Sequence, residues 1–481
     1  METPLVSILQ SLSQRKESPF YAPGHKKGRG ISAELIELLG EKVFQADLPE
    51  LPELDNLFAP ETVLKRAQEM AAETFNAQQT WFLINGSTCG LIAAILATCN
   101  PGDKIILPRN CHQAVFSGLI LSGAIPVFLQ PEYDPSWDIS YCFAPDTLNL
   151  ALNKHPEAKA VLVTYPTYQG VAGNLLEIEG ITHQKGIPLI VDEAHGAHFL
   201  FHHELPDCAL SLGADLVIQS THKVLGSLTQ SSMLHLQGSR VDPERISRAL
   251  RLVQSSSPSY LLLASLDGAR AQMDREGSLL LDKTLNLAKS ARSQLKSIKH
   301  LSILEQSSYH GEGFKSLDLS RLTVKTSQLG LSGFWVDRWL RQNRNITAEL
   351  PNLHNLTFMI TIGNSAQDIS NLVEAFQALV KEVGQSAEIP LPLMPPSVND
   401  ILELSPREAF FGKSEIINHS LAPGRICAEL ICPYPPGIPL IMPGEQISQA
   451  QLDYLNVALQ QGAIVAGCQD TNVETIKVLL N

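Results

Sequence analysis

The stretch Asp215-Leu216-Val217-Ile218-Gln219-Ser220-Thr221-His222-Lys223 carries the signal that decides the fold of this chain. Its apolar run is typical of a buried strand, so Lys223 follows the carboxyl end of that strand. An earlier apolar run, Pro188-Leu189-Ile190-Val191, leads in the same way into Asp192-Glu193-Ala194-His195-Gly196. The two patterns predict an α/β protein in which a lysine and a carboxylate each follow a buried strand.

This pairing suits pyridoxal phosphate, which needs a lysine amine for its Schiff base and an acid partner for its pyridine nitrogen. Asp192 would be ionised and would keep the ring nitrogen protonated. Lys223 would have to lose its proton, and a nearby cation helps to lower the pKa of its amine. Taken alone, each residue has a plainer interpretation, in which Asp192 caps a turn and Lys223 is a solvated lysine.

A phosphate site is predicted after the strand Trp81-Phe82-Leu83-Ile84, where Asn85-Gly86-Ser87-Thr88 leads into the apolar helical stretch 91–97. Gly86 permits a tight turn. Ser87 or Thr88 can cap the helix, whose free N–H groups attract an anion. An ordinary helix cap is the alternative interpretation of this turn.

Further polar side chains follow predicted strands and would face the same cleft. Ser220 and His222 directly precede Lys223 and could reach the phosphate from the other side. The predicted strand 104–108 leads into Arg109-Asn110-Cys111-His112, and His112 could stack on the pyridine ring. As a lone histidine it would more often be a structural residue.

Together these motifs resemble the ornithine/lysine/arginine decarboxylase family of fold-type I pyridoxal-phosphate enzymes. The order and spacing of the matching segments span nearly the whole chain, and the likeness is greatest to the short biosynthetic bacterial members, including arginine decarboxylases of polyamine synthesis. The matching segments are 23–26, 85–88, 109–112, 166–168, 192–196, 220–223, 433–439 and 442–445.

The resemblance implies a role for each motif residue. Lys223 would carry the cofactor, Asp192 would pair with the pyridine nitrogen, and His112 would stack on the ring. His195 would lie beside the cofactor. The phosphate would be held by Ser87, Thr88, Ser220 and His222. The resemblance also implies a homodimer or higher homo-oligomer, because fold-type I sites lie at a subunit interface.

The implied fold is an aspartate-aminotransferase-like large domain with a mostly parallel sheet, a small α/β domain and a C-terminal decarboxylase domain. The chain alternates strands and helices over 61–300, as in a parallel sheet covered on both faces. We expect an N-terminal arm over 1–60 and the small domain over 301–390. A proline-rich link over 389–396 introduces the last domain, 391–481.

The expected reaction is decarboxylation of a basic amino acid, with arginine to agmatine favoured, lysine to cadaverine next and ornithine to putrescine also considered. A cationic substrate needs an acidic distal pocket. The candidate carboxylates are Asp55 from a partner subunit, Glu408, Glu429 and Glu445. Two alternatives stay open, which are another fold-type I reaction such as transamination or aldol cleavage, and a non-catalytic protein that keeps the fold for binding.

Charge and composition indicate which kinds of molecule the protein binds. The chain has 36 basic and 49 acidic residues and a formal net charge of −13, which argues against nucleic acid and anionic membranes. The uncharged stretch 114–129 is too short and too interrupted to span a bilayer. We therefore expect a small-molecule substrate, no nucleic acid and no membrane.

Cysteine and histidine positions bear on metal sites and on the compartment. The eight cysteines form no Cys-x-x-Cys pair, which indicates reduced thiols rather than a zinc site or a disulfide framework. His195, His198, His202 and His203 raise the alternative of a metal site, but no second cluster completes one. With no signal-peptide pattern at Met1-Glu2-Thr3-Pro4, we expect a cytoplasmic protein without a metal.

Overall fold

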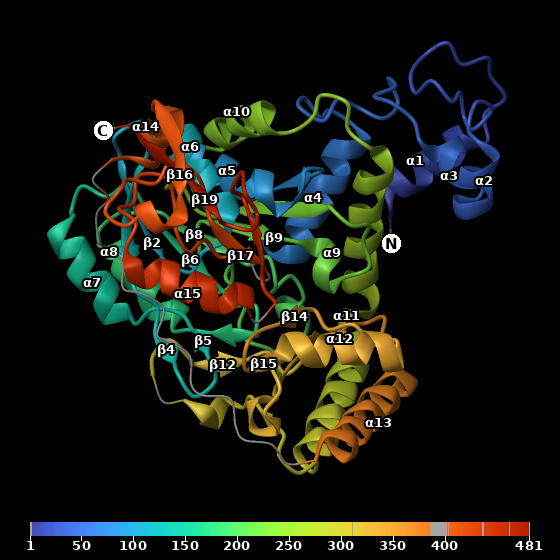
Figure 1. The fold of residues 1–481 in the computed structure, drawn as a ribbon. Coiled ribbons are helices and arrows are strands. Elements are labelled where there is room, and N and C mark those ends of the chain that lie inside the picture. The colour runs from blue at the N-terminus through green and yellow to red at the C-terminus, as the bar shows by residue number, and fades with distance from the viewer. Residues whose placement is uncertain are drawn as a thin grey trace.

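The computed structural model describes residues 2–309, 311–384, 402, 404–434, 437–460 and 462–480. At its centre lies a seven-stranded sheet in the order β1-β10-β9-β8-β6-β2-β3 (Figure 1). The five strands from β9 to β3 are parallel, whereas β10 runs antiparallel to both of its neighbours. These strands are β1 (Gln79–Leu83), β2 (Lys104–Pro108), β3 (Ile125–Leu129), β6 (Ala160–Thr164), β8 (Leu189–Asp192), β9 (Leu216–Gln219) and β10 (Ser232–Leu236).

The apolar runs of these strands are explained by burial on both faces of the sheet. In β6, Val161 and Val163 belong to one hydrophobic core, whereas Ala160 and Leu162 belong to a second core on the opposite face. Alternate residues of a strand point to opposite faces, so a continuous apolar run supplies both cores. The mostly parallel sheet predicted from the sequence is thereby confirmed.

Helices cover both faces of the sheet (Figure 1). Buried side chains of α4, α7, α8 and α11 belong to the first core, and those of α5, α6 and α10 to the second. The helices are α4 (Val63–Phe75), α5 (Gly86–Thr98), α6 (Gln113–Ser122), α7 (Pro145–Lys154), α8 (Leu175–Gln184), α9 (Thr221–Val224), α10 (Pro243–Val253) and α11 (Tyr260–Lys296). Short strands and a 3-10 turn complete this body, namely β4 (Tyr133–Asp134), β5 (Ile139–Ser140), β7 (Val171–Ala172) and η1 (Phe199–Phe201).

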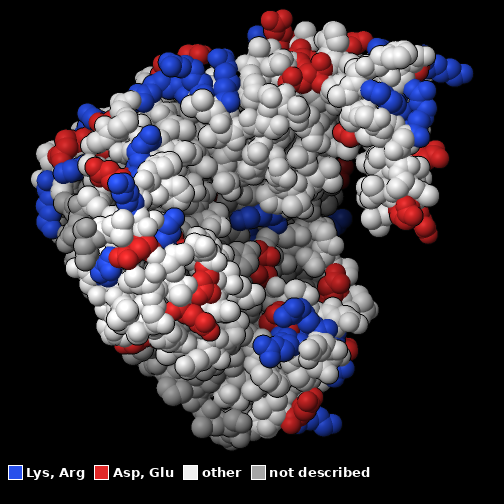
Figure 2. Space-filling model, turned by 45° about the horizontal axis from the view of Figure 1, so that its top comes forward, with Lys and Arg blue, Asp and Glu red and all other residues white. Residues whose placement is uncertain are grey.

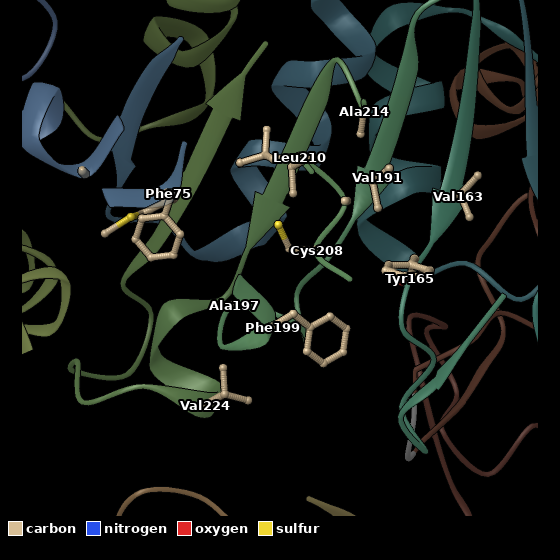
Figure 3. Close-up of a cluster of buried hydrophobic side chains, with 14 of the residues drawn as sticks. Phe75, Val163, Tyr165, Val191, Ala197, Phe199, Cys208, Leu210, Ala214 and Val224 are labelled. Atoms are coloured by element: carbon tan, nitrogen blue, oxygen red, sulfur yellow. The ribbon is translucent and has the colours of Figure 1, made fainter. Parts of the chain in front are cut away.

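The first core supports the loops that follow the strands. Figure 3 shows Val163 of β6 and Val191 of β8 together with Tyr165 and Phe199 from the segments beyond those strands. Tyr165 and Phe199 form an edge-to-face pair with ring centroids 6.2 Å apart. Because apolar anchors fix the chain on both sides of the strand ends, the polar residues between them have defined positions.

A second unit has its own antiparallel sheet in the order β11-β13-β15-β14 and a separate core. Its elements are β11 (Ser302–Ile303), η2 (Gln306–Ser308), β13 (Arg321–Lys325), η3 (Ser327–Leu329), α12 (Gly333–Arg344), β14 (Leu350–Pro351), β15 (Asn355–Met359) and α13 (Ala366–Val383). The end of α11 contributes Ala288, Ala291 and Leu295 to this core. In contrast, β12 (Ser316–Leu317) pairs with β7 of the main body.

The last part of the chain forms a further core around Cys427, Ile431 and Leu455. Its elements are α14 (Pro406–Phe411), β16 (Ser414–Asn418), η4 (His419–Leu421), β17 (Cys432–Tyr434), α15 (Gln449–Gln460), β18 (Ile464–Ala466) and β19 (Thr475–Leu479). The predicted link over 389–396 lies outside the described residues, as do Pro435 and Pro436 of the late proline-rich motif.

The segment expected to form an N-terminal arm divides into two parts. Helix α1 (Pro4–Ser13) buries Leu5, Leu9 and Leu12 in the first core. Helices α2 (Ala33–Leu39) and α3 (Glu41–Ala46) lie to one side of the body (Figure 1), and α2 has no buried residue. Phe20 is 94% exposed and Leu38 is 75% exposed, so this outer part presents apolar side chains to solvent.

Candidate active site

Lys223 lies in the short helix α9, directly after β9. Its Nζ is 2.9 Å from Nε2 of His195, within hydrogen-bond distance. Burial lowers the pKa of the Lys223 amine, the charge of Asp192 opposes this effect, and the charge of Arg321 adds to it. The site therefore shifts the Lys223 amine toward its unprotonated form, which is the nucleophilic one.

Asp192 is the last residue of β8, the strand next to β9 in the sheet. Its buried carboxylate accepts one hydrogen bond within the described part of the chain, from the N–H of Ala194 at 3.2 Å. Burial raises the pKa of Asp192 to about 6, and the Lys223 charge works against that rise. A buried carboxylate with acceptor capacity to spare fits a protonated ring nitrogen, which is the partner that pyridoxal phosphate offers.

His195 sits between Lys223 and the aromatic ring of Tyr168, whose centroid is 5.0 Å from its own in an edge-on arrangement. Burial and the Lys223 charge hold the pKa of His195 well below its ordinary value, so the imidazole is neutral. Its buried Nδ1 has no hydrogen-bond partner among the described residues. Because buried polar atoms are normally hydrogen-bonded, His195 Nδ1 is suited to bind a polar group of a ligand.

His112 caps the start of α6 and has a fixed ring orientation. Its Nδ1 accepts the N–H of Ala114 at 3.1 Å, so the neutral ring carries its proton on Nε2. Burial, followed by the charge of Lys223, lowers the pKa of His112 to about 4. The structure thus brings His112 into the electrostatic range of Lys223 as a neutral imidazole, a state that suits stacking on an aromatic ring.

Three of the four expected phosphate residues converge at the start of α5 or beside it. Gly86 has φ of +72°, a conformation that glycine adopts without strain, and it turns the chain from β1 into the helix. The hydroxyl of Ser220 donates to Ser87 Oγ at 2.9 Å, which joins the Lys223 loop to the helix N-terminus. Thr88 lies in the same first turn and is exposed. Free N–H groups and hydroxyls at a helix N-terminus form a suitable cradle for a phosphate.

His222 is held differently from the other phosphate candidates. Its Nδ1 donates to the carbonyl oxygen of Ser231 at 2.8 Å. Burial lowers the pKa of His222, while the hydrogen bond to Ser231 opposes that change. The ring is therefore fixed in orientation, and its remaining nitrogen, Nε2, can donate to an anion only when the ring carries a second proton.

The four carboxylates expected in a distal substrate pocket are all engaged by donors of their own chain. Asp55 accepts the N–H groups of Thr62 and Leu64. Glu408 is the exposed third residue of α14 and forms a capping box with Ser405. The two remaining acids are buried in the C-terminal unit, where Glu429 accepts the N–H groups of Gln469 and Lys477, and Glu445 binds Arg109, Met442 and Gln451.

Two charged residues that no sequence motif singled out lie close to the site instead. Within the described residues, the charges that act on the Lys223 amine are those of Asp192, Arg321 and Glu349. Glu349 is exposed and precedes β14, and its charge also acts on Arg321. Both residues come from the second unit, far along the chain, so only their position in the tertiary structure identifies them.

A cavity of about 210 Å³ lies where the three units meet, and its lining includes neighbours of these residues but not Arg321 or Glu349 themselves. Its walls include Thr164 and Tyr168 of the main body, Leu350 of the second unit and Tyr454 of the C-terminal unit. Thr164 is paired in register with Asp192, and Leu350 follows Glu349. The space-filling view also shows a recess between the main body and the second unit in which acidic and basic side chains are both visible (Figure 2).

The histidines that raised the alternative of a metal site have separate partners. His198 binds Asp318, whereas His202 binds Asp282 on α11 and stacks on His203. The described residues contain no group of three or more His, Cys, Asp or Glu side chains arranged to share a metal ion. None of the described helices combines the length and the apolar character needed to cross a membrane.

The comparisons with known proteins agree with this geometry. Residues 3–368 match the family model of the Orn/Lys/Arg decarboxylase major domain, and residues 402–470 match that of the C-terminal domain. The arginine decarboxylase of Bacillus subtilis (strain 168) is 39% identical over 99% of this chain and 98% of its own length. The lysine decarboxylase LdcA of Pseudomonas aeruginosa is 27% identical over 95% of this chain and 76% of its own length.

The fold is also found in solved structures. The structure of lysine decarboxylase A from Pseudomonas aeruginosa superposes with a TM-score of 0.84 at 23% identity, covering 99% of this chain and 80% of that one. This likeness confirms the predicted fold class. Both family models and a full-length relative at 39% identity converge on one answer, and the chain belongs to the Orn/Lys/Arg decarboxylase family of amino-acid decarboxylases.

Proposed function

We propose that this decarboxylase uses pyridoxal phosphate, held on Lys223, and that arginine is its preferred substrate. The observation that carries the proposal is the placement of Lys223 and Asp192 at the carboxyl ends of two adjacent parallel strands. Ligands of open α/β sheets bind outside these strand ends. When bound, the cofactor would supply an electron sink for the pair of electrons left behind as carbon dioxide departs.

Different residues of the site would hold and orient the ring and the phosphate of the cofactor. Asp192 would hold a proton on the ring nitrogen, and the neutral ring of His112 would lie against one face of the cofactor. Ser87, Thr88, Ser220 and His222 would hold the phosphate. His195, 2.9 Å from the Lys223 amine, is placed to exchange a proton with that nitrogen.

The substrate's cationic end would meet an acidic side chain, and Glu349 suits this role better than the four carboxylates named from the sequence. It is exposed, lies close enough for its charge to act on Lys223, and adjoins the cavity through Leu350. The preference for arginine is supported by the 39% identical relative, which is itself named an arginine decarboxylase. Agmatine, the product, would enter polyamine biosynthesis.

A homodimer is the assembly that we expect in solution. The outer part of the N-terminal segment presents Phe20 and Leu38 to solvent and stands apart from the body (Figure 1). Contiguous exposed apolar patches mark protein contacts, and we assign these two side chains to the contact with a second subunit. The eight cysteines are free thiols, seven of them buried, which suits a reducing compartment such as the cytoplasm.

The proposal is tested by measuring carbon dioxide release from arginine, lysine and ornithine by the purified, cofactor-loaded protein. We expect the highest kcat/KM with arginine, no requirement for a keto acid, and loss of release in Lys223→Ala. Equal or higher kcat/KM with lysine would overturn the arginine preference. Release that persists in Lys223→Ala, or that occurs without pyridoxal phosphate, would overturn the cofactor assignment.

A further inference from the structure

A buried charged cluster contacts the main chain of His195. It consists of Asp318 and Arg321, on either side of the turn into β13, and of His198 in the segment before η1. Asp318 Oδ2 is 3.0 Å from His198 Nε2 and 3.6 Å from Arg321 Nε. Buried ion pairs carry a large desolvation cost, so a cluster retained here invites a functional explanation.

Arg321 connects this cluster to the residue that contacts the lysine. Its Nη2 donates to the main-chain carbonyl of His195 at 3.0 Å, and the side chain of the same histidine reaches the Lys223 amine. The guanidinium therefore fixes the backbone from which the imidazole extends. A shift of that backbone would move Nε2 of His195 away from the Lys223 amine.

The charge of Arg321 is only partly balanced. The side chain is 1% exposed, yet its Nε and Nη1 have no hydrogen-bond partner within the described ranges. Its ion-pair partner Asp318 is shared with His198. Burial raises the pKa of Asp318, but the charge and hydrogen bond of His198, the charge of Arg321 and the hydrogen bond of Ser320 together hold it at about 2. A buried cation with a shared counter-ion leaves positive potential in its surroundings.

That potential reaches Lys223 and works with burial to lower the pKa of its amine. The negative charges that face the amine from other elements are Asp192 at the end of β8 and Glu349 before β14, and both oppose the effect. The rings of His112 and His195 are neutral. Arg321 is thus a cation whose field favours the unprotonated lysine.

Close packing fixes the position of the Arg321 side chain. Gly170, with φ of +83°, lies against its aliphatic stem, and a Cβ at this glycine would come within 2.5 Å of Arg321 Cγ. The main chain of Gly170 also accepts the N–H of Asp318 at 2.9 Å. The loop after β6 therefore packs closely against one side of the Arg321 stem.

We propose that Arg321 is a positioning residue, which holds His195 against Lys223 and keeps the Lys223 amine in its nucleophilic form, with Asp318 moderating the strength of that effect. The proposal deepens the function proposed above and rests on its assignment of Lys223 as the reactive amine. It assigns no direct contact between Arg321 and the substrate or the cofactor.

The test measures the reactivity of Lys223 in the cofactor-free protein, so that it is independent of decarboxylation. Trace acetylation across a pH series, with the Lys223 peptide quantified by mass spectrometry, reports the midpoint of amine deprotonation. We expect Arg321→Met to raise this midpoint by about 1 pH unit, because a nearby cation is removed. Arg321→Lys, which retains the charge, should leave the midpoint near that of the wild type.

Asp318→Asn is expected to move the midpoint in the opposite direction, because it removes the counter-charge of Arg321. Circular dichroism and thermal unfolding show whether Arg321→Met folds. If it does not, the midpoint measured in Asp318→Asn tests the proposal. An unchanged midpoint in a folded Arg321→Met, or in Asp318→Asn where Arg321→Met is unfolded, would overturn the proposal.

Arg270 provides a matched control. It is fully buried, pairs with Asp267 at 2.6 Å three residues earlier in α11, and also has two guanidinium nitrogens without a partner among the described residues. Arg270→Met should lower stability without moving the Lys223 midpoint, and an equal shift there would show that the effect is a general loss of packing. A wild-type protein that lacks decarboxylase activity but shows the Arg321 shift would refute the proposed function and leave this inference standing.

Discussion

Arg109 and Glu445 form a buried ion pair with Nη2 and Oε2 3.2 Å apart, which joins the end of β2 to the C-terminal unit. Arg109 also donates to the carbonyl oxygens of Pro439 and Leu440 in that unit. Three residues later in the chain lies His112, whose neighbour Gln113 donates its N–H to the carbonyl of Gly437. These contacts therefore hold the C-terminal unit against the end of β2, next to His112, the residue expected to stack on the cofactor ring.

Removing one partner of this pair should be costly. Glu445→Gln leaves Arg109 buried without its counter-charge, so we expect a loss of about 3–5 kcal/mol in the free energy of unfolding, measured with denaturant. The exposed pair Lys296–Glu305 is the control, for which Lys296→Gln should cost at most ~1 kcal/mol. If Glu445→Gln and Lys296→Gln lost the same free energy of unfolding, the Arg109–Glu445 pair would not stabilise the contact between the units.

Asp192 should make the cofactor-free protein less stable as the pH rises. Burial raises the pKa of its carboxyl to about 6 in the folded protein, so between its ordinary pKa and this value the folded state binds the proton that the unfolded chain has released. Stability from this group is therefore present at low pH and is lost as the pH rises through about 6. Asp192→Asn should remove that slope from the melting temperatures of the apoprotein.

The same substitution should weaken cofactor binding. Losing a hydrogen bond to a charged partner costs ~1.5–3 kcal/mol, which corresponds to an increase of about 10- to 100-fold in the dissociation constant for pyridoxal phosphate. Fluorescence titration of the apoprotein measures it. An Asn variant that binds the cofactor as tightly as the wild type would show that Asp192 does not pair with the ring nitrogen.

Glu349→Gln should raise the KM for arginine by at least about 10-fold with a smaller effect on kcat, because a charge-assisted hydrogen bond to the substrate is lost. Steady-state carbon dioxide release provides both constants. Glu374, an exposed glutamate on α13 of the same unit, is the control, and its Gln variant should behave as the wild type. An unchanged KM in Glu349→Gln would show that Glu349 does not bind the substrate, and the four carboxylates named from the sequence would be tested next.

Gly170→Ala should destabilise the protein through contact with Arg321 as well as through backbone strain. Gly186 is the matched control, since it has φ of +69° but open space where a Cβ would lie. We expect a cost of ~1 kcal/mol for Gly186→Ala from strain alone, and ~1–3 kcal/mol more for Gly170→Ala from overpacking. Thermal unfolding of both variants gives the difference, and equal costs would indicate that the Arg321 side chain moves freely.

The sequence predicted the main body well because its signals are local. The run Lys104–Pro108 is a strand with the predicted bounds, since a strand buried on both faces needs a continuous apolar run. The motif residues that follow such runs, Asp192 and Lys223 among them, come together because adjacent parallel strands end at the same edge of the sheet.

The acidic side chain that we propose for substrate binding, Glu349, could not be predicted from local sequence signals. Glu408 and Glu445 stand beside recognisable motifs, but their carboxylates are used to cap a helix and to balance a buried arginine. A carboxylate's partners depend on which donors the folded chain brings to it, and this information is absent from its own neighbourhood in the sequence.

By itself, the sequence determined the α/β body, its strand ends and the lysine and aspartate that follow them, because hydrophobic periodicity and turn residues act over a few positions. Only the tertiary structure decided that Glu349 and Arg321, from a separate antiparallel unit, act on Lys223. Electrostatic effects depend on distance through space, and the packing of the second unit against the sheet sets those distances.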